Sequence, residues 1–304
     1  YHGSTMGAGN LTGEPRRFNC ETNGVSGYIK FFDPYIYREP IEFKSEAEAT
    51  KYYLAKLREQ IIYENPETVA AIECETITGS NGCIIPPDGY LQGIRDICDE
   101  FGIMMICDEV MMGWGRTGEY FAFQNWDVKP DLVSFAKGVT CGYAPLGGVI
   151  VSKKIAEYFD DHKLLCGLTY SGHPLSCAAG VATLDVYKEE KLVENSKAMG
   201  KILGEILEEL KRKHPCVGDV RYKGLFSALE LVKDKATKEP LVEYNSDPDN
   251  TMGKIIGSLK KKGFSTYSHE NCIIVAPPLI IKEDELRAAM DIMDEVLGEV
   301  DKMI

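Results

Sequence analysis

Short apolar runs alternate with helical patterns along the first half of the chain. Apolar segments of strand length occur in "TVAAIECETI", "IMMICDEV", "DLVSFAKG" and "GGVIVS". Between the loops, residues 45–64 predict an amphipathic helix with Ser45 as its N-cap, and residues 88–101 predict a second helix that ends at Gly102. Near-continuous apolar strands that alternate with helices are typical of a parallel sheet covered on both faces. The pattern therefore predicts an α/β domain with a mostly parallel sheet.

The pattern changes near residue 174, where long helices replace the alternation. Helical periodicity runs through "PLSCAAGVATLDVYKEE" and "KLVENSKAMGKILGEILEELKRKH", and "VGDVRYKGLFSALELV" then indicates two antiparallel strands with Gly224 at the turn. A helix in "DNTMGKIIGSLKKKG", a strand in "CIIVAPP" and a closing helix in "KEDELRAAMDIMDEVLGEV" follow. Helices grouped beside a few strands are typical of an α+β domain. We therefore expect a large domain over residues 1–200 and a smaller α+β domain over residues 201–304.

Residues 105–118, "MICDEVMMGWGRTG", combine an acidic strand end with a glycine pattern. The three glycines match G-x-G-x-x-G, the pattern of a loop that binds a dinucleotide pyrophosphate. That function requires a helix directly after the glycines. The following "EYFAFQNWDVKPD" is aromatic, is broken by Pro130 and has no helical period. We therefore interpret the glycines as a tight surface loop and expect the chemistry at Asp108.

Composition and charge exclude several classes of protein. The 304 residues are 44% hydrophobic and 27% charged, which is ordinary for a globular protein. The net charge of −13 disfavours nucleic acid as a partner, and no apolar run approaches the ~20 residues of a membrane helix. The ten cysteines lack a C-x-x-C pair, so we expect no metal site and free thiols in a reducing cytoplasm. Because it opens "YHGSTMGAG" without a Met, we interpret the chain as part of a longer protein.

Two ionisable residues, Asp108 and Lys137, each follow an apolar strand directly. The carboxyl ends of neighbouring parallel strands meet at one edge of a sheet, where ligands bind. There the two side chains either form a structural ion pair, since an unpaired buried charge is costly, or hold pyridoxal phosphate. In the second case the lysine amine bonds to the cofactor aldehyde, and the aspartate keeps the pyridine nitrogen protonated. Their position at the strand ends leaves both alternatives open.

Four separated motifs favour the second alternative. The segments "ICDEVMMGWGRTG", "DLVSFAKGVTCGYAPLGGVIVS", "GLTYSGHPLSCAAG" and "VAPPLIIKEDEL" resemble, in the same order, the class III aminotransferases of fold type I. The resemblance runs from Tyr1 to the C-terminus. It implies pyridoxal 5′-phosphate as the cofactor, a small-molecule amine donor and a 2-oxo acid acceptor. It also implies a homodimer or a dimer of dimers, with active sites at the interface.

The resemblance implies roles for five residues around the cofactor ring. Lys137 is similar to the family lysine that bonds to the cofactor, and Asp108 to the partner of the pyridine nitrogen. Val110 resembles the residue that packs on one face of the ring, and Tyr1 the aromatic residue on the opposite face. His2, the next residue of "YHG", belongs to the same cofactor contacts. Taken singly, Val110 is more typical of a sheet core, and Tyr1 could belong to a disordered terminus.

Two further residues have roles only by resemblance. Thr169, in "GLTYSGHP", is similar to the threonine that reaches the cofactor phosphate of the neighbouring subunit, although it could instead cap the following helix. Glu75 resembles the family glutamate near the substrate and the cofactor 3-hydroxyl, although it could instead pair with an arginine. Arg116 we interpret as a loop residue rather than as a substrate ligand.

The departures from the family pattern concern the phosphate and the substrate. The family's Gly-Ser-rich phosphate loop, which precedes "YHG", lies outside these 304 residues. Many relatives also carry an arginine shortly before "APPL" that binds an α-carboxylate, and "GFSTYSHENCIIVAPP" has none. Thr76 replaces the usual proline after the family glutamate, so that "ETITGSNG" most resembles the taurine–pyruvate branch.

We therefore expect an aminotransferase that moves the amino group of an ω-amino donor, taurine first, to pyruvate, giving alanine and an aldehyde. Transamination of β-alanine, 4-aminobutyrate or another ω-amine is the first alternative. A pyridoxal phosphate aminomutase of similar fold and a catalytically incompetent fragment are the others.

Overall fold

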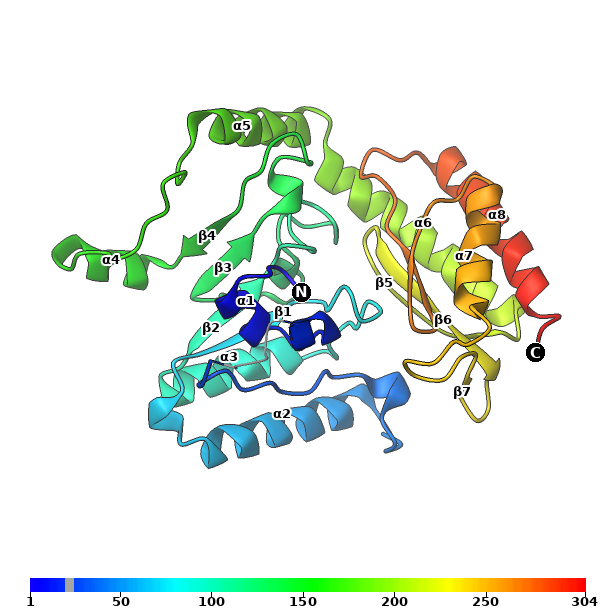
Figure 1. Ribbon diagram of the computed structural model, residues 1–304, viewed down its shortest axis with the longest axis horizontal. Helices are drawn as coiled ribbons and strands as arrows, with labels where there is room; N and C mark the ends of the chain where they lie inside the picture. Colours follow the sequence, from blue (N-terminus) through cyan, green and yellow to red (C-terminus); the bar gives the residue numbers. More distant parts are fainter. Residues whose placement is uncertain (20–24) are drawn as a thin grey trace.

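The computed structural model describes residues 1–19 and 25–304, and the strands of this part form two sheets (Figure 1). The first sheet has the order β1-β2-β3-β4. β1, β2 and β3 run parallel, and β4 pairs with β3 in the antiparallel direction. The predicted mostly parallel sheet is confirmed. Its strands are β1 (Ala71–Glu75), β2 (Met104–Asp108), β3 (Leu132–Phe135) and β4 (Gly148–Val151).

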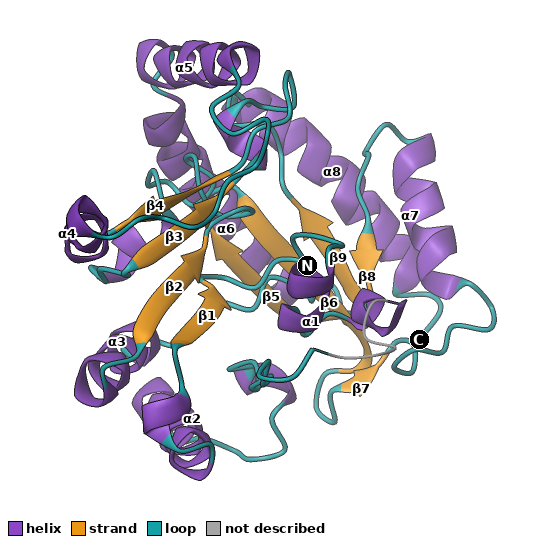
Figure 2. Cartoon of the chain, turned by 60° about the vertical axis from the view of Figure 1, so that its left-hand side comes forward, coloured by secondary structure: helices purple, strands orange, loops and turns teal. Residues whose placement is uncertain are grey.

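Two helices, α2 (Glu46–Tyr63) and α3 (Tyr90–Phe101), cover one face of this sheet (Figure 2). The Ser45 hydroxyl caps α2 as predicted, and Gly102 ends α3 with a φ of 70°. α3 begins two residues later than predicted, because Gly89 takes the left-handed φ of 81° and cannot belong to the helix. The apolar side chains of both helices and of the strands form a common core, which includes Tyr53, Leu57, Ile72, Leu91, Ile94, Met105 and Cys107.

Short elements make up most of the remaining first half, as the sequence predicts for its first fifty residues. Figure 1 shows α4 standing away from the sheet, joined to α5 by a long connection. That connection, residues 162–173, is exposed along its whole length. The helices are α1 (Met6–Leu11), α4 (Lys153–Asp161), α5 (Pro174–Glu189), η1 (Pro15–Asn19), η2 (Ile36–Arg38), η3 (Pro66–Thr68), η4 (Ala122–Trp126) and η5 (Lys137–Val139).

The second sheet is antiparallel and has the order β5-β6-β9-β8, with β7 paired to β6. Gly224 lies between β5 and β6 with a φ of 56°, so the predicted hairpin and its glycine turn are confirmed. The two-residue strands β7 and β8 have no counterpart in the sequence prediction. The strands are β5 (Val217–Lys223), β6 (Phe226–Asp234), β7 (Glu239–Pro240), β8 (Ser268–His269) and β9 (Cys272–Val275).

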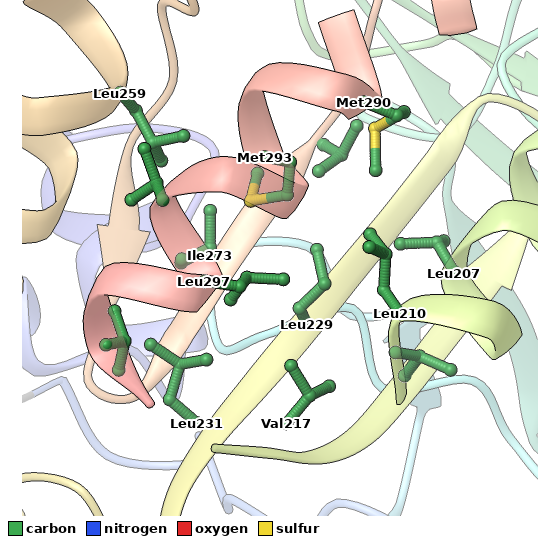
Figure 3. Close-up of a cluster of buried hydrophobic side chains, with 14 of the residues drawn as sticks. Leu207, Leu210, Val217, Leu229, Leu231, Leu259, Ile273, Met290, Met293 and Leu297 are labelled. Carbon is green, nitrogen blue, oxygen red and sulfur yellow. The ribbon is translucent and has the colours of Figure 1, made fainter. Parts of the chain in front are cut away.

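Three helices pack against this second sheet around one apolar core: α6 (Leu192–Lys213), α7 (Thr251–Lys261) and α8 (Glu283–Val300). Figure 3 shows side chains of α6, α7 and α8 meeting those of β5, β6 and β9. The arrangement confirms the predicted α+β character of the C-terminal part. Within the described ranges, no helix is long and apolar enough to cross a membrane. The domain division at residue 200, which falls inside α6, stays a prediction.

The glycine-rich loop after β2 is buried, so the prediction of a surface loop was wrong. Trp114 and Thr117 in this loop are 8% and 4% exposed. Gly118, with a φ of 87°, lets the loop approach α6 so closely that a Cβ there would lie 3.1 Å from the Lys197 backbone. Arg116 donates to two carbonyl oxygens beside strands of the second sheet. These are Leu225, directly before β6, at 3.0 Å, and Pro277, shortly after β9, at 2.6 Å. The loop therefore joins the first sheet to the C-terminal part, and Arg116 has a structural role there.

Candidate active site

The strands β2 and β3 bring Asp108 and Lys137 to the same edge of the first sheet. Asp108 is the last residue of β2 and lies opposite Ser134 of β3 in the parallel register. Lys137 follows the end of β3 by two residues. The backbone N–H of Val110 donates to Asp108 Oδ1 at 2.9 Å and fixes the carboxylate. The predicted meeting of the two residues at one sheet edge is confirmed.

His2 lies between the two residues and contacts both. Its Nδ1 is 2.6 Å from Asp108 Oδ2, and its Nε2 is 3.0 Å from Lys137 Nζ. Among the ion pairs of the described residues, none joins Lys137 directly to Asp108. The structural ion pair that the sequence left open is therefore not formed. The imidazole ring of His2 instead bridges the two groups at the cavity wall.

Asp108 is held in its charged form. Burial raises the pKa of this carboxyl, but the hydrogen bond and charge of His2 and the Val110 N–H oppose burial and lower the pKa overall. A carboxylate that stays ionised can accept a hydrogen bond from a protonated ring nitrogen. Asp108 thus has the charge that the nitrogen of a pyridinium ring requires.

Lys137 is shifted in the direction of a neutral amine. Burial lowers the pKa of this amine, and the positive charge of Arg16 adds to the effect, while Glu75 and Asp108 act against it. Its backbone takes a φ of 43°, a left-handed conformation that costs a non-glycine residue about 1 kcal/mol or more. The turn that follows is held by the Tyr187 hydroxyl, which donates to the Gly138 carbonyl at 3.1 Å. Strain of this kind concentrates at functional sites.

The two residues of the acidic pair Asp108-Glu109 have different surroundings: Asp108 contacts His2 at the cavity, and Glu109 is buried in the structure behind it. Glu109 is fully buried and accepts hydrogen bonds from the backbone N–H of Ala122 at 2.8 Å and of Phe123 at 3.0 Å. Thr76 also donates its hydroxyl to Glu109. The threonine that departs from the family pattern therefore ties β1 to the start of η4 beneath the site.

A cavity of about 730 Å³ opens at this edge of the sheet. Four of the residues predicted for the site line it: Tyr1, His2, Val110 and Lys137. Asp108 does not line the cavity itself but contacts His2, which does. Glu75 is held beside it, with its Oε2 accepting from the Gly79 N–H at 2.8 Å. The other lining residues are Glu14, Arg16, Ser80, Met111, Ala136, Tyr267, Ser268 and His269.

Thr169 lies apart from the other predicted residues. It belongs to the exposed connection between α4 and α5 and does not line the cavity. The contact that the resemblance implies would be made to a neighbouring subunit, so this chain alone does not test it. The role of Thr169 therefore stays a prediction.

Sequence reasoning missed two groups of lining residues. Glu14 and Arg16 come from the loop-rich N-terminal segment, where no periodic pattern marks an inward-facing side chain. His269 belongs to β8, a strand too short to be found from periodicity, and Tyr267 lies directly before it. The signals were the position of Arg16 shortly after "YHG" and the aromatic and histidine residues directly before the apolar run of β9.

Known proteins resemble this chain over nearly its full length. The family model "Aminotransferase class-III" matches residues 1–297. The uncharacterized aminotransferase YhxA of Bacillus subtilis is 37% identical over 94% of this chain and 63% of its own length. The taurine–pyruvate aminotransferase of Bilophila wadsworthia is 34% identical over 99% of this chain and 66% of its own length. The chain thus spans about two thirds of the length of these relatives.

A solved structure gives the same result for the fold. The taurine:2-oxoglutarate aminotransferase of Bifidobacterium kashiwanohense, in complex with PLP and glutamate, superimposes with a TM-score of 0.95 at 50% identity, over 99% of this chain and 68% of that protein. The predicted architecture of fold type I pyridoxal phosphate enzymes is confirmed. Taken with the strand-end aspartate and lysine, the match over residues 1–297 establishes that this chain belongs to the class III aminotransferases.

Proposed function

We propose that the complete protein transfers the amino group of an ω-amino acid, taurine in the first place, to a 2-oxo acid, with pyridoxal 5′-phosphate as cofactor. The single observation that carries the proposal is the joint contact of His2 with Asp108 and Lys137 at the cavity. It brings an anion and an amine of lowered pKa to one ring-sized space.

The residues of the cavity fit the cofactor at its ring and at its aldehyde. A volume of about 730 Å³ lies within the range of ligand pockets, about 300–1,000 Å³. Asp108 offers the anion for the ring nitrogen, and Val110 and Tyr1 offer an aliphatic and an aromatic surface for the ring faces. For the phosphate we propose Thr169 of a second subunit. The phosphate end of the cofactor would then be bound by residues outside this chain's own cavity.

Each side chain has a separate task in this proposal. When bound, pyridoxal 5′-phosphate supplies an aldehyde that bonds to amines and a ring that accepts the electron pair of the adjacent carbon. Asp108 keeps the ring nitrogen protonated through its carboxylate. Lys137 Nζ would hold the aldehyde end until the donor amine displaces it, and the freed amine would then accept the proton from the donor carbon that bears nitrogen. Glu75, whose charge acts on Lys137, would orient the cofactor hydroxyl.

Arg16 supports an acid-bearing donor. Its guanidinium lines the same cavity as Lys137 and stacks over the Tyr1 ring, with 4.1 Å between the guanidinium carbon and the ring centroid. Guanidinium groups bind sulfonates and carboxylates through charge-assisted hydrogen bonds. The missing arginine before "APPL" is thus replaced by a cation from another part of the chain. Pyruvate is our first acceptor, and 2-oxoglutarate is the second, since the 50% identical neighbour is named for it.

A homodimer completes the proposal. Large apolar side chains of the connection between α4 and α5 are exposed, with Leu165, Leu168 and Tyr170 at 87%, 79% and 79%. Exposed large apolar side chains grouped in one segment are typical of an interaction surface. Thr169 lies within it, so self-association would carry this residue to a neighbouring site. The nine free cysteines of the described residues are in keeping with a cytoplasmic enzyme.

The test is an amine-donor screen of the complete protein with pyruvate and with 2-oxoglutarate. We expect alanine or glutamate to form with taurine, and expect the absorbance band of the bound cofactor near the visible edge to be lost in Lys137→Ala. The proposal fails if no donor gives an amino acid product, or if the band persists without the lysine amine.

A further inference from the structure

Glu14 and Arg16 form an ion pair on the wall of the cavity. Glu14 Oε1 accepts from Arg16 Nε at 2.7 Å, and Glu14 Oε2 accepts from the Arg16 backbone N–H at 2.7 Å. The Glu14 side chain is 15% exposed and the Arg16 side chain 56% exposed. The carboxylate is therefore the fixed member of the pair, and the guanidinium is the open one.

The pair leaves most of the guanidinium available to a ligand. Arginine has five N–H donors, and Glu14 uses only the Nε donor of the Arg16 side chain. Among the described residues, no other hydrogen bond to this guanidinium is formed. Two terminal nitrogens of Arg16 can therefore meet an anion in the cavity while Glu14 holds the side chain from behind.

We infer that Glu14 is a specificity-determining residue, which weakens the attraction of Arg16 for acid-bearing donors and provides an anionic site for a cationic donor end. The inference rests on the proposed function and identifies the residue that selects among donors. An anionic sulfonate bound to Arg16 is also repelled by the Glu14 carboxylate. The ammonium end of a diamine would instead be attracted by Glu14 and repelled by Arg16.

Other charged groups of the cavity do not replace this pair. Asp108 is bonded to His2, and Glu75 is bonded to the Gly79 N–H, so both are held at the lysine end. His269 lines the cavity from β8. Glu14 and Arg16 both come from the segment that follows "YHG", and their opposite charges are in direct contact. Removing one charge therefore exposes the other to the ligand.

The experiment compares three amine donors of similar length whose far ends are anionic, neutral and cationic: taurine, propylamine and 1,3-diaminopropane. The complete holoenzyme and its Glu14→Gln and Arg16→Gln variants are assayed for kcat/KM with each donor. Binding of ethanesulfonate, which has no amine to react, is measured by calorimetry on the same proteins. Glu14→Asp keeps the charge, and Glu119→Gln neutralises a carboxylate that is paired with Lys197 outside the cavity lining.

We expect opposite changes in the two main variants. Glu14→Gln should raise kcat/KM for taurine and tighten ethanesulfonate binding about three- to tenfold, as removal of a partly screened like charge predicts. Arg16→Gln should lower both by at least about tenfold and raise the use of 1,3-diaminopropane. Propylamine with each variant, and Glu119→Gln with every donor, should show the behaviour of the unaltered enzyme. Glu14→Asp, which keeps the charge, should keep the ratio of taurine use to 1,3-diaminopropane use.

Two outcomes would overturn the inference. If Glu14→Gln weakens taurine and ethanesulfonate as Arg16→Gln does, Glu14 only positions the arginine. If both variants change all three donors equally, the pair does not sense the donor's charge. Both results leave the proposed function standing, because the unaltered enzyme would still transfer amino groups. Absence of transfer by the unaltered enzyme with every donor would instead remove the proposed function itself.

Discussion

Glu73 of β1 and Glu230 of β6 are strand glutamates with opposite surroundings. Glu230 accepts from Arg221 Nη1 at 2.7 Å and also bonds to Arg38 and Tyr35. Burial raises its pKa, but the charge of Arg221 leads a set of partners that lower it overall. Glu73 makes no hydrogen bond or ion pair with any described residue, and burial, followed by the charge of Asp108, raises its pKa to about 7.

The two sheets differ in the same way in their apolar cover. The first seven residues of β6 are all buried. Leu229 and Leu231 pack under the helices α6, α7 and α8, and Phe226 and Ala228 pack with Ile77 and Met112 on the other face. In β4, at the edge of the first sheet, Val149 and Ile150 are 57% and 44% exposed. The buried charges of the C-terminal part are thus paired, in part by Tyr35 and Arg38 of the N-terminal half, and its core is covered. The first sheet keeps charges and apolar surface available, which is the arrangement that ligand and partner binding need.

Lys137→Ala should have the largest effect and should act on activity alone. Loss of the amine removes both the cofactor bond and the proton transfer, so we expect amino transfer by the complete protein to fall at least about 10³-fold. Thermal unfolding should change little, because among the described residues this amine forms no ion pair and loses only its contact with His2 at 3.0 Å. Lys153→Ala, at an exposed lysine on α4, is the control. A variant that is unstable as well as inactive would contradict the division between a working first sheet and a supporting second part.

Glu230→Gln should show the reverse behaviour in the second sheet. The buried Arg221 would lose most of its counter-charge, although Asp219 at 2.9 Å still contacts it. We expect a loss of about 3–5 kcal/mol in the free energy of unfolding, measured with urea. Glu239→Gln on β7 removes an exposed partner of Lys233 and should cost less than about 1 kcal/mol. Equal losses in the two variants would mean that the buried cluster contributes no more than a surface pair.

Leu229→Ala and Val149→Ala compare the apolar cover of the two sheets directly. Leu229 of β6 is fully buried among α6 and α8, so its truncation leaves a cavity and should cost about 2–4 kcal/mol. Val149 of β4 has half its surface in solvent, and its truncation should change stability by less than about 1 kcal/mol. Urea unfolding of the two variants gives both numbers. A large loss at Val149 would indicate that another segment or subunit covers β4 in solution.

The sequence predicted most of the fold because its elements carry local signals. Ser45 and Gly102 mark helix ends by their own chemistry, and the apolar runs of β1 to β3 have strand length. β8 escaped prediction because a two-residue strand exists only through its pairing with β9. The burial of the loop around Trp114 depends on α6, which lies some eighty residues further along the chain. Contacts of this kind leave no periodic pattern.

The site was predictable only in part for the same reason. Asp108 and Lys137 could be placed together because parallel strands bring their ends to one edge. His2 could not be placed between them, because it is more than a hundred positions away in the sequence from each of the two residues. Arg16 was missed because its role depends on the spatial approach of the N-terminal segment to Lys137, and its own neighbours in the sequence are loop residues.

Glu73→Gln should have the smallest effect, and its sign depends on pH. The pKa of Glu73 rises from 4.5 to about 7 on folding, so the folded chain holds this proton more tightly than the unfolded chain. The stability of the unaltered protein should therefore fall as pH rises from about 4.5 to 7. Glutamine carries no such proton, so Glu73→Gln should be more stable than the parent at pH 8 by about 1–2 kcal/mol and similar to it at pH 5. Urea unfolding at both pH values measures the difference, with Glu67→Gln as an exposed control. A gain of the same size at both pH values would show that the ionised form of Glu73 does not destabilise the folded protein.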